Sequence, residues 1–224
     1  MKYPVNEIIY TWQGEGCNHG RPATFIRLHG CPVHCTFCDS AGTWHPDYVP
    51  KKIPRLDAGE ILQQVGRAPL VVITGGEPAI HDLRPLTMTL IAAGKTVAIE
   101  TCGAFPLQGD FHWVTVSPKR AAPPIASVLQ RATEFKFVIE ARNDIWVFLD
   151  MVETGMGLRT TRTIWLHPEW SVRESALVLT GISDAVKQMG RDFRAGYQLH
   201  KLYGVDQQDA RCMPTAPLGG VARQ

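Results

Sequence analysis

Short apolar runs alternate with longer amphipathic segments along most of the chain. Six runs of four to six residues are rich in β-branched and other apolar side chains, which is typical of strands. They lie at residues 25–28, 70–74, 96–101, 112–116, 134–139 and 163–166. Five segments carry apolar positions at helical spacing and are predicted to be helices. They lie at residues 58–65 (capped by Asp57), 82–93, 125–132, 142–153 and 172–189 (ended by Gly190).

Two further strands complete the predicted sheet. Residues 5–12 are rich in β-formers and are predicted to be a strand or hairpin arm, and residues 196–199 a last short strand. Strands that alternate with helices in this way predict an α/β fold with a parallel sheet. A full eight-unit barrel takes about 250 residues, so for 224 residues we expect a partial, modified TIM-like barrel of about six βα units.

The chain shows no internal repeat and no interdomain linker. We therefore expect one domain at residues 1–203 and a tail at residues 204–224, which is rich in Gly, Pro, Gln and Ala. The tail is expected to be largely disordered or to form a surface strap. Residues 43–56 hold three prolines and two lysines, which predicts a surface loop without regular structure.

Composition excludes some classes of function. The formal net charge is +2, and no run of Lys or Arg suggests a nucleic-acid partner. No apolar stretch approaches transmembrane length, and the first residues lack the apolar core of a signal peptide. We expect a cytoplasmic protein without a membrane partner, in which metal binding is a commoner use of cysteine than disulfides. Cys17, Cys102 and Cys212 are scattered and are expected to be ordinary single thiols.

The other three cysteines form a motif that carries chemistry. Cys31, Cys35 and Cys38 follow the strand at residues 25–28 with CxxxCxxC spacing. A [4Fe–4S] cluster normally takes four thiolates, so a protein that supplies three leaves one iron open to another ligand. The alternative is a Cys3His zinc site completed by a nearby histidine, but structural zinc ligands usually come as two separated pairs. The spacing therefore favours a cluster over zinc.

A second motif agrees with the first. Residues 71–78 are an apolar run that ends in Gly75-Gly76-Glu77-Pro78. CxxxCxxC with an aromatic residue, Phe37, before the last cysteine resembles the signature of radical S-adenosylmethionine (SAM) enzymes, and the second motif is similar to their GGEP sequence. The resemblance implies that this sequence contacts the amino group of SAM.

The resemblance extends along roughly residues 2–203 to one family. The Gln13-Gly14-Glu15-Gly16 turn, Arg27, the Cys-Asp-Ser ending of the cysteine motif, and the Ile-Glu-Thr, Val-Ser-Pro-Lys and Gln-Leu-His-Lys segments resemble 7-carboxy-7-deazaguanine synthases. This implies a radical SAM lyase that converts 6-carboxy-5,6,7,8-tetrahydropterin to 7-carboxy-7-deazaguanine with loss of ammonia, as in queuosine biosynthesis. It also implies a [4Fe–4S] cluster, SAM, Mg2+, a homodimer and an external, flavodoxin-like electron donor.

The resemblance implies a role for each matching residue. The cluster ligands are Cys31, Cys35 and Cys38. The SAM contacts are Phe37, Cys38, Asp39, Gly76, Glu77, Ser117, Pro118, Lys119 and His167. The substrate contacts, several of them in the N-terminal segment, are Trp12, Gln13, Gly14, Glu15, Arg27, Thr74 and His200. The Mg2+ ligand is Ser40.

The positions of these residues support the site independently. Most of them follow the predicted strands one after another, and catalytic residues of barrels sit at the carboxyl ends of strands. Ordinary alternatives remain for three features. Arg27 can pair with Glu15 or Asp39 instead of clamping a substrate carboxylate, Ser40 can cap a turn, and the turn at residues 12–16 can be a plain hairpin turn.

Three departures from the family pattern bear on the site. Ser40 stands where the family has threonine, so we expect retained but looser Mg2+ binding. His167-Pro168 stands where relatives carry Gln-Pro near SAM. The chain also continues past the His-Lys sequence, where a terminal carboxylate can reach the substrate in relatives. Two other functions compete with the synthase: a radical SAM activase that makes a glycyl radical on a partner protein, and a zinc-stabilised binding module without catalysis.

Overall fold

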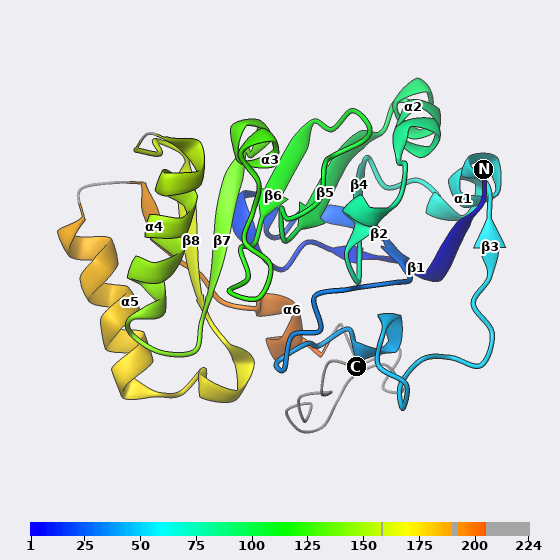
Figure 1. The fold of residues 1–224 in the computed structure, drawn as a ribbon. Helices are drawn as coiled ribbons and strands as arrows, with labels where there is room; N and C mark the ends of the chain where they lie inside the picture. Colours follow the sequence, from blue (N-terminus) through cyan, green and yellow to red (C-terminus); the bar gives the residue numbers. More distant parts are fainter. Residues whose placement is uncertain (158, 190–191, 205–224) are drawn as a thin grey trace.

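The structure, a computed structural model, describes residues 1–157, 159–189 and 192–204. Over these residues, nine strands form one sheet in the order β3–β1–β2–β4–β5–β6–β7–β8–β9 (Figure 1). The strands are β1 (Tyr3–Trp12), β2 (Pro22–Leu28), β3 (Arg55–Leu56), β4 (Leu70–Gly75), β5 (Thr96–Thr101), β6 (Trp113–Val116), β7 (Glu134–Ile139), β8 (Thr163–Pro168) and β9 (Phe193–Ala195).

The sheet is parallel except at its first edge. From β2 to β9 each neighbouring pair is parallel, whereas β1 runs antiparallel to both β2 and β3. The strand order is linear and the sheet does not close on itself. The prediction of an α/β fold with an incomplete barrel is therefore confirmed.

In the part of the chain that the structure describes, five helices cover one side of the sheet. They are α1 (Ala58–Val65), α2 (Arg84–Ala92), α3 (Ala126–Arg131), α4 (Asp144–Met156) and α5 (Ala176–Gln188). The short α6 (Leu199–Leu202) lies on the other side, near the loop that follows β2 (Figure 1). No described helix has the length and apolarity needed to span a bilayer.

The cap of α1 shows why a helix begins there. The Asp57 carboxylate accepts a hydrogen bond from the Glu60 backbone N–H at 2.9 Å, and the Glu60 carboxylate accepts one from the Asp57 N–H at 2.8 Å. This reciprocal pair satisfies two backbone donors that the first turn leaves without helical partners. The predicted cap at Asp57 is confirmed.

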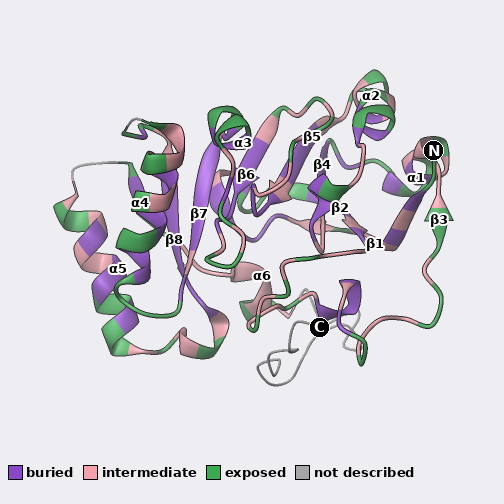
Figure 2. Cartoon of the chain, in the orientation of Figure 1, coloured by how far each residue is buried: buried purple, intermediate pink, exposed green. Residues whose placement is uncertain are grey.

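Alternation along the strands separates an apolar face from a polar one. Residues such as Ile73, Ile99 and Phe137 are buried in one cluster with Leu86 and Leu90 of α2 and other helix side chains. In Figure 2, strands such as β7 and β8 are coloured mostly as buried. Successive side chains in a strand point to opposite faces. The intervening positions therefore face away from the helices, and near the carboxyl ends of the strands they carry polar side chains. These are Arg27, Thr74, Glu100, Lys136 and His167.

Several predicted element boundaries were wrong. Residues 196–199 are not a strand: β9 ends at Ala195, and α6 begins at Leu199. Residues 43–56 are not wholly irregular, because Arg55 and Leu56 pair with β1 as β3. The last long helix starts at Ala176 rather than at residue 172, since Trp170–Val172 is a separate 3-10 turn. Gly190, Cys212 and residues 205–224 of the predicted tail lie outside the described residues.

Candidate active site

A pocket of about 270 Å³ opens at the carboxyl ends of the parallel strands. Of the residues expected in the site, all but Pro118 line it. They are Trp12, Gln13, Gly14, Glu15, Arg27, Cys31, Cys35, Phe37, Cys38, Asp39, Ser40, Thr74, Gly76, Glu77, Ser117, Lys119, His167 and His200. The structure therefore brings together segments that are separated by up to about 190 residues in the sequence.

The three motif cysteines are free thiols on one loop beside this pocket. Burial raises the pKa of all three, and the neighbouring Asp39 charge helps to raise that of Cys38 to about 12. The Trp44 indole N–H donates to the Cys38 sulfur at 3.3 Å. Among the described residues, no three His, Cys, Asp or Glu side chains lie close enough together to hold a single metal ion.

The loop after β4 touches the backbone at the start of the cysteine loop. The Gly76 N–H donates to the Leu28 carbonyl at 3.1 Å, and the Glu77 N–H donates to the Gly30 carbonyl at 2.9 Å. A Cβ on Gly76 would lie 2.3 Å from the Gly30 oxygen and 2.7 Å from the Cβ of Cys31. Gly75 adopts a φ of 143°, which side chains rarely permit. Both glycines are needed for the two loops to approach so closely.

Glu77 locks the same loop to the end of β5. Its side chain is buried, and its carboxylate accepts hydrogen bonds from the Thr101 hydroxyl at 2.6 Å, the Cys102 N–H at 2.7 Å and the Ala79 N–H at 3.0 Å. A buried carboxylate with several donors is held in one orientation. The Gly-Gly-Glu-Pro sequence thus forms a rigid wall between the cysteine loop and β5.

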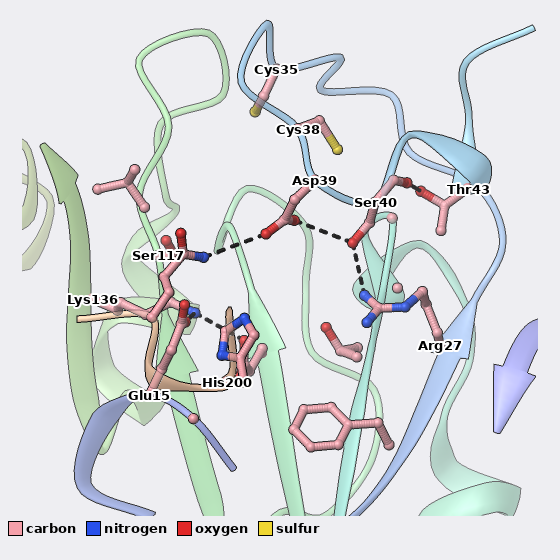
Figure 3. A pocket seen from close by; sticks show the side chains of 18 of the residues that line it. Glu15, Arg27, Cys35, Cys38, Asp39, Ser40, Thr43, Ser117, Lys136 and His200 are labelled. Carbon is pink, nitrogen blue, oxygen red and sulfur yellow. Dashed lines mark hydrogen bonds and ion pairs between the residues drawn. The ribbon is translucent and has the colours of Figure 1, made fainter. Parts of the chain in front are cut away.

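Arg27 and Ser40 form a chain of polar contacts under the cysteine loop (Figure 3). The Arg27 Nη1 donates to the Ser40 Oγ at 2.8 Å, and its Nε donates to Glu7 at 2.6 Å. The Ser40 hydroxyl donates to Asp39 at 3.3 Å. Arg27 pairs with Glu7 and not with Glu15 or Asp39, the two partners considered as an alternative to a substrate carboxylate, because Glu7 lies opposite Arg27 in the β1–β2 register. Ser40 starts a 3-10 turn, but its side chain makes no capping hydrogen bond.

Asp39 connects the cysteine loop to α6. The Lys201 Nζ lies 2.9 Å from the Asp39 carboxylate, and only 8% of the Lys201 side chain is exposed. Burial raises the pKa of Asp39, but the Lys201 charge and hydrogen bond outweigh it, so this pKa falls to about 2. The contact holds α6 across one side of the pocket.

The turn at residues 13–16 is anchored from β7. The buried Glu134 carboxylate accepts from the Cys17 N–H at 2.9 Å, the Thr115 hydroxyl at 2.8 Å and the Trp113 indole at 3.0 Å. A Cβ on Gly16 would lie 2.5 Å from the same carboxylate, and the φ of Gly16 is 66°. The turn is thus a fixed part of the pocket wall, and it is not a plain solvent-exposed hairpin turn.

His167 on β8 is a buried titratable group of the pocket, and Lys119 after β6 is a half-buried one. His167 is 2% exposed, and neither of its ring nitrogens has a hydrogen-bond partner among the described residues. Burial lowers the pKa of His167 to about 4, so the ring is neutral near pH 7. The Lys119 ammonium donates to the Ser117 carbonyl and hydroxyl at 2.8 and 2.7 Å, and burial lowers its pKa.

Comparison with known proteins identifies the family. No family model matches the chain. The 7-carboxy-7-deazaguanine synthase of Escherichia coli K12 is 40% identical, over 92% of this chain and 100% of the relative. That of Synechocystis sp. is 36% identical, over 92% and 94%. The crystal structure of QueE from Escherichia coli superposes with a TM-score of 0.75 at 34% identity, covering 89% of this chain and 95% of that chain. The chain belongs to the 7-carboxy-7-deazaguanine synthase family.

Membership of the 7-carboxy-7-deazaguanine synthase family implies a radical SAM lyase with a [4Fe–4S] cluster and SAM. It confirms the resemblance found in the sequence. Neither the activase nor the zinc-binding module is favoured, since relatives match over nearly their whole length.

The pocket of this synthase family member also contains residues that sequence reasoning missed. Lys136 and Lys201 are buried cations that each bind an acidic residue of the site, and Glu7 binds Arg27. Lys136 had a visible signal, because Glu134 and Lys136 are charged residues at alternate positions of an otherwise apolar strand. Lys201 lies in the His-Lys sequence that the family comparison already singled out.

Proposed function

We propose that this protein converts 6-carboxy-5,6,7,8-tetrahydropterin to 7-carboxy-7-deazaguanine with loss of ammonia. The observation that carries the proposal is one pocket that combines three motif thiols, the Gly-Gly-Glu-Pro wall and the Gln13–Glu15 turn, in a chain of this family. In this proposal, residues 1–203 form one catalytic domain, and its N-terminal segment binds the substrate.

The donor set fits the cluster that the family implies. Cys31, Cys35 and Cys38 would be its ligands, and their three thiols leave one iron for SAM. A reduced cluster with SAM supplies the one-electron chemistry that abstracts a hydrogen atom from the substrate. Because burial keeps the free thiols protonated, loading must release protons.

The residues proposed to hold SAM surround this loop. Gly76 allows the Gly-Gly-Glu-Pro loop to lie against the cysteine loop, and the Lys119 ammonium lies beside Ser117. The remaining proposed contacts are Phe37, Cys38, Asp39, Glu77, Pro118 and His167. The ring nitrogens of His167 have no hydrogen-bond partner among the described residues, which supports its place among these contacts, since a neutral ring can donate one hydrogen bond and accept another.

The substrate is proposed to lie between the turn at residues 12–15 and Arg27. A guanidinium recognises a carboxylate through charge-assisted hydrogen bonds, so Arg27 is proposed to bind the 6-carboxylate. Gln13 and Glu15 provide an amide and a carboxylate for the edge of the ring. Trp12, Gly14, Thr74 and His200 complete the proposed contacts. His200 lies close to Gly14, where a Cβ would be 2.2 Å from its Nδ1.

Mg2+ is proposed to bind the Ser40 hydroxyl, together with substrate and water oxygens. The hydroxyl faces the pocket and is not used as a helix cap. Because Arg27 donates to this hydroxyl, we expect Mg2+ binding to release Arg27 toward the substrate carboxylate. We further propose a cytoplasmic homodimer that receives electrons from a flavodoxin-like donor.

An anaerobic product assay tests the function. The protein is reconstituted with iron and sulfide and incubated with SAM, Mg2+, dithionite and 6-carboxytetrahydropterin, and products are identified by mass spectrometry. We expect 7-carboxy-7-deazaguanine from the wild type and from Cys17→Ser, but not from Cys31→Ser. Cys17 is the matched control, because it is a thiol outside the motif. Formation of 5′-deoxyadenosine without the deazaguanine would mean that the substrate is wrong.

A further inference from the structure

One cation on the pocket wall joins two carboxylates from different elements. The Lys136 Nζ on β7 donates to Glu100 on β5 at 3.0 Å and to Glu15 in the turn before Gly16. The side chains of Lys136, Glu15 and Glu100 are 11%, 9% and 20% exposed. Gln13 donates to the other oxygen of Glu100 at 2.7 Å. The turn, β5 and β7 therefore meet at a single ammonium group.

Lys136 offsets the electrostatic repulsion between the two carboxylates that contact it. Where like charges share a partly buried site, one of the two groups tends to take up a proton. Burial raises the pKa of Glu15, but the Lys136 charge outweighs this effect and brings this pKa below its usual range. Burial lowers the pKa of Lys136, but Glu100 and Glu15 outweigh this and bring it above its usual range.

Other charged groups face this cluster from every side. His167 on β8 and His200 on α6 lie near Glu15. Glu134 is two residues before Lys136 on β7, and Lys119 follows β6. Because burial keeps His167 neutral near pH 7, it does not replace the charge of Lys136. Lys119 is engaged with Ser117. Of the described groups, Lys136 is thus the cation in direct contact with both carboxylates.

We propose that Lys136 is a positioning residue that holds Glu15 and Glu100 together as ionised acceptors for the N–H donors of the substrate ring. The inference rests on the proposed function and adds two residues, Glu100 and Lys136, to its binding site. The amino-pyrimidinone edge of a pterin presents adjacent N–H groups, and an ionised carboxylate can accept two hydrogen bonds. A protonated carboxyl group loses part of this acceptor capacity, so removal of the charge should make binding depend on pH.

The test measures binding of 6-carboxypterin, a stable oxidised analogue, by fluorescence titration across the neutral pH range. Lys136→Gln keeps a donor but removes the charge. We expect its dissociation constant, divided by that of the wild type at the same pH, to rise as pH falls, by up to about tenfold per pH unit. Taking the ratio cancels any titration of the probe itself.

Three further variants separate charge from structure. Lys136→Arg restores the charge, and Lys136→Gln/Glu100→Gln removes the second carboxylate, so both ratios should be independent of pH. Lys187→Met, which removes an exposed lysine on α5, is the matched control and should behave as wild type. A uniform loss of affinity in Lys136→Gln at every pH would overturn the proposal, since that is the result of a purely structural role.

Calorimetry of the wild type provides a readout that does not depend on any variant folding. If Glu15 and Glu100 are already ionised, 6-carboxypterin should bind with the same heat in two buffers of different ionisation enthalpy. Proton release on binding would overturn the proposal even if every Lys136 variant misfolds. If the wild type does not bind 6-carboxypterin at all, the pterin substrate of the proposed function fails, and the role of Lys136 in binding it fails as well.

Discussion

Gly76→Ala should separate the Gly-Gly-Glu-Pro loop from the cysteine loop. The added Cβ would lie 2.3 Å from the Gly30 carbonyl oxygen, so the loops must part by about 1.1 Å to reach the 3.4 Å of an ordinary contact. Neither side can yield easily, because the Gly76 and Glu77 N–H groups are bonded to the backbone of Leu28 and Gly30. The substitution therefore strains the hydrogen bonds that position Cys31.

The magnitude follows from the cost of overpacking. Forcing a methyl group into a packed contact costs about 1–3 kcal/mol. For a protein of this size, the melting temperature falls by about 2–4 °C for each kcal/mol. We expect a similar displacement at Cys31 to reduce iron loading and SAM binding, since the three thiols no longer hold the relative positions that a single cluster needs.

The assay compares thermal unfolding of the unloaded protein, iron and sulfide content after anaerobic reconstitution, and SAM affinity. Gly59→Ala in α1 is the matched control. Its Cβ would lie 3.4 Å from Asp57, and alanine in a helix stabilises by about 0.5–1 kcal/mol relative to glycine. If Gly76→Ala melts like the wild type and retains its iron and SAM affinity, then the close contact does not constrain the site.

Substitutions at three further positions test single residues. Arg27→Ala should weaken substrate binding about ten- to a hundredfold, the loss of a charge-assisted hydrogen bond, while SAM cleavage survives; unchanged substrate affinity would refute the role of Arg27. Ser40→Ala should weaken Mg2+ stimulation and Ser40→Thr should retain it, whereas equal stimulation in both would remove Ser40 from the Mg2+ site. His167, with its pKa lowered from 6.5 to about 4, contributes stability that is complete above pH 6.5 and is lost as pH falls toward 4, by about 3 kcal/mol at most. Urea unfolding of His167→Gln should lack this component, and an unchanged pH slope would contradict the buried neutral ring.

Local sequence patterns correctly predicted the helices and strands that are determined by residues close together in the chain. Asp57 marks the start of α1 because its cap closes within three residues, and β5 and β7 have the bounds that their apolar runs predict. Residues 199–202 show the opposite case. The sequence predicts a strand at residues 196–199 that leads into them, but the Leu199 N–H donates to the Gly14 carbonyl at 3.3 Å, and Lys201 binds Asp39. These long-range contacts favour a helical turn, which the local sequence pattern does not predict.

The candidate site divides in the same way. Residue spacing alone identifies the three cysteines, the Gly-Gly-Glu-Pro loop and the turn at residues 13–16. Each of these motifs is made of residues that are close together in the sequence. The partners of Arg27 and Lys136 come from tertiary structure alone. Lys136 contacts Glu15, which is 121 positions away in the sequence. Arg27 pairs with Glu7 because the two residues lie opposite each other in the β1–β2 register. The sequence by itself determined which groups this protein carries. Only the packing of distant strands decided which charges face each other, since pairing energy depends on distance in space and on burial.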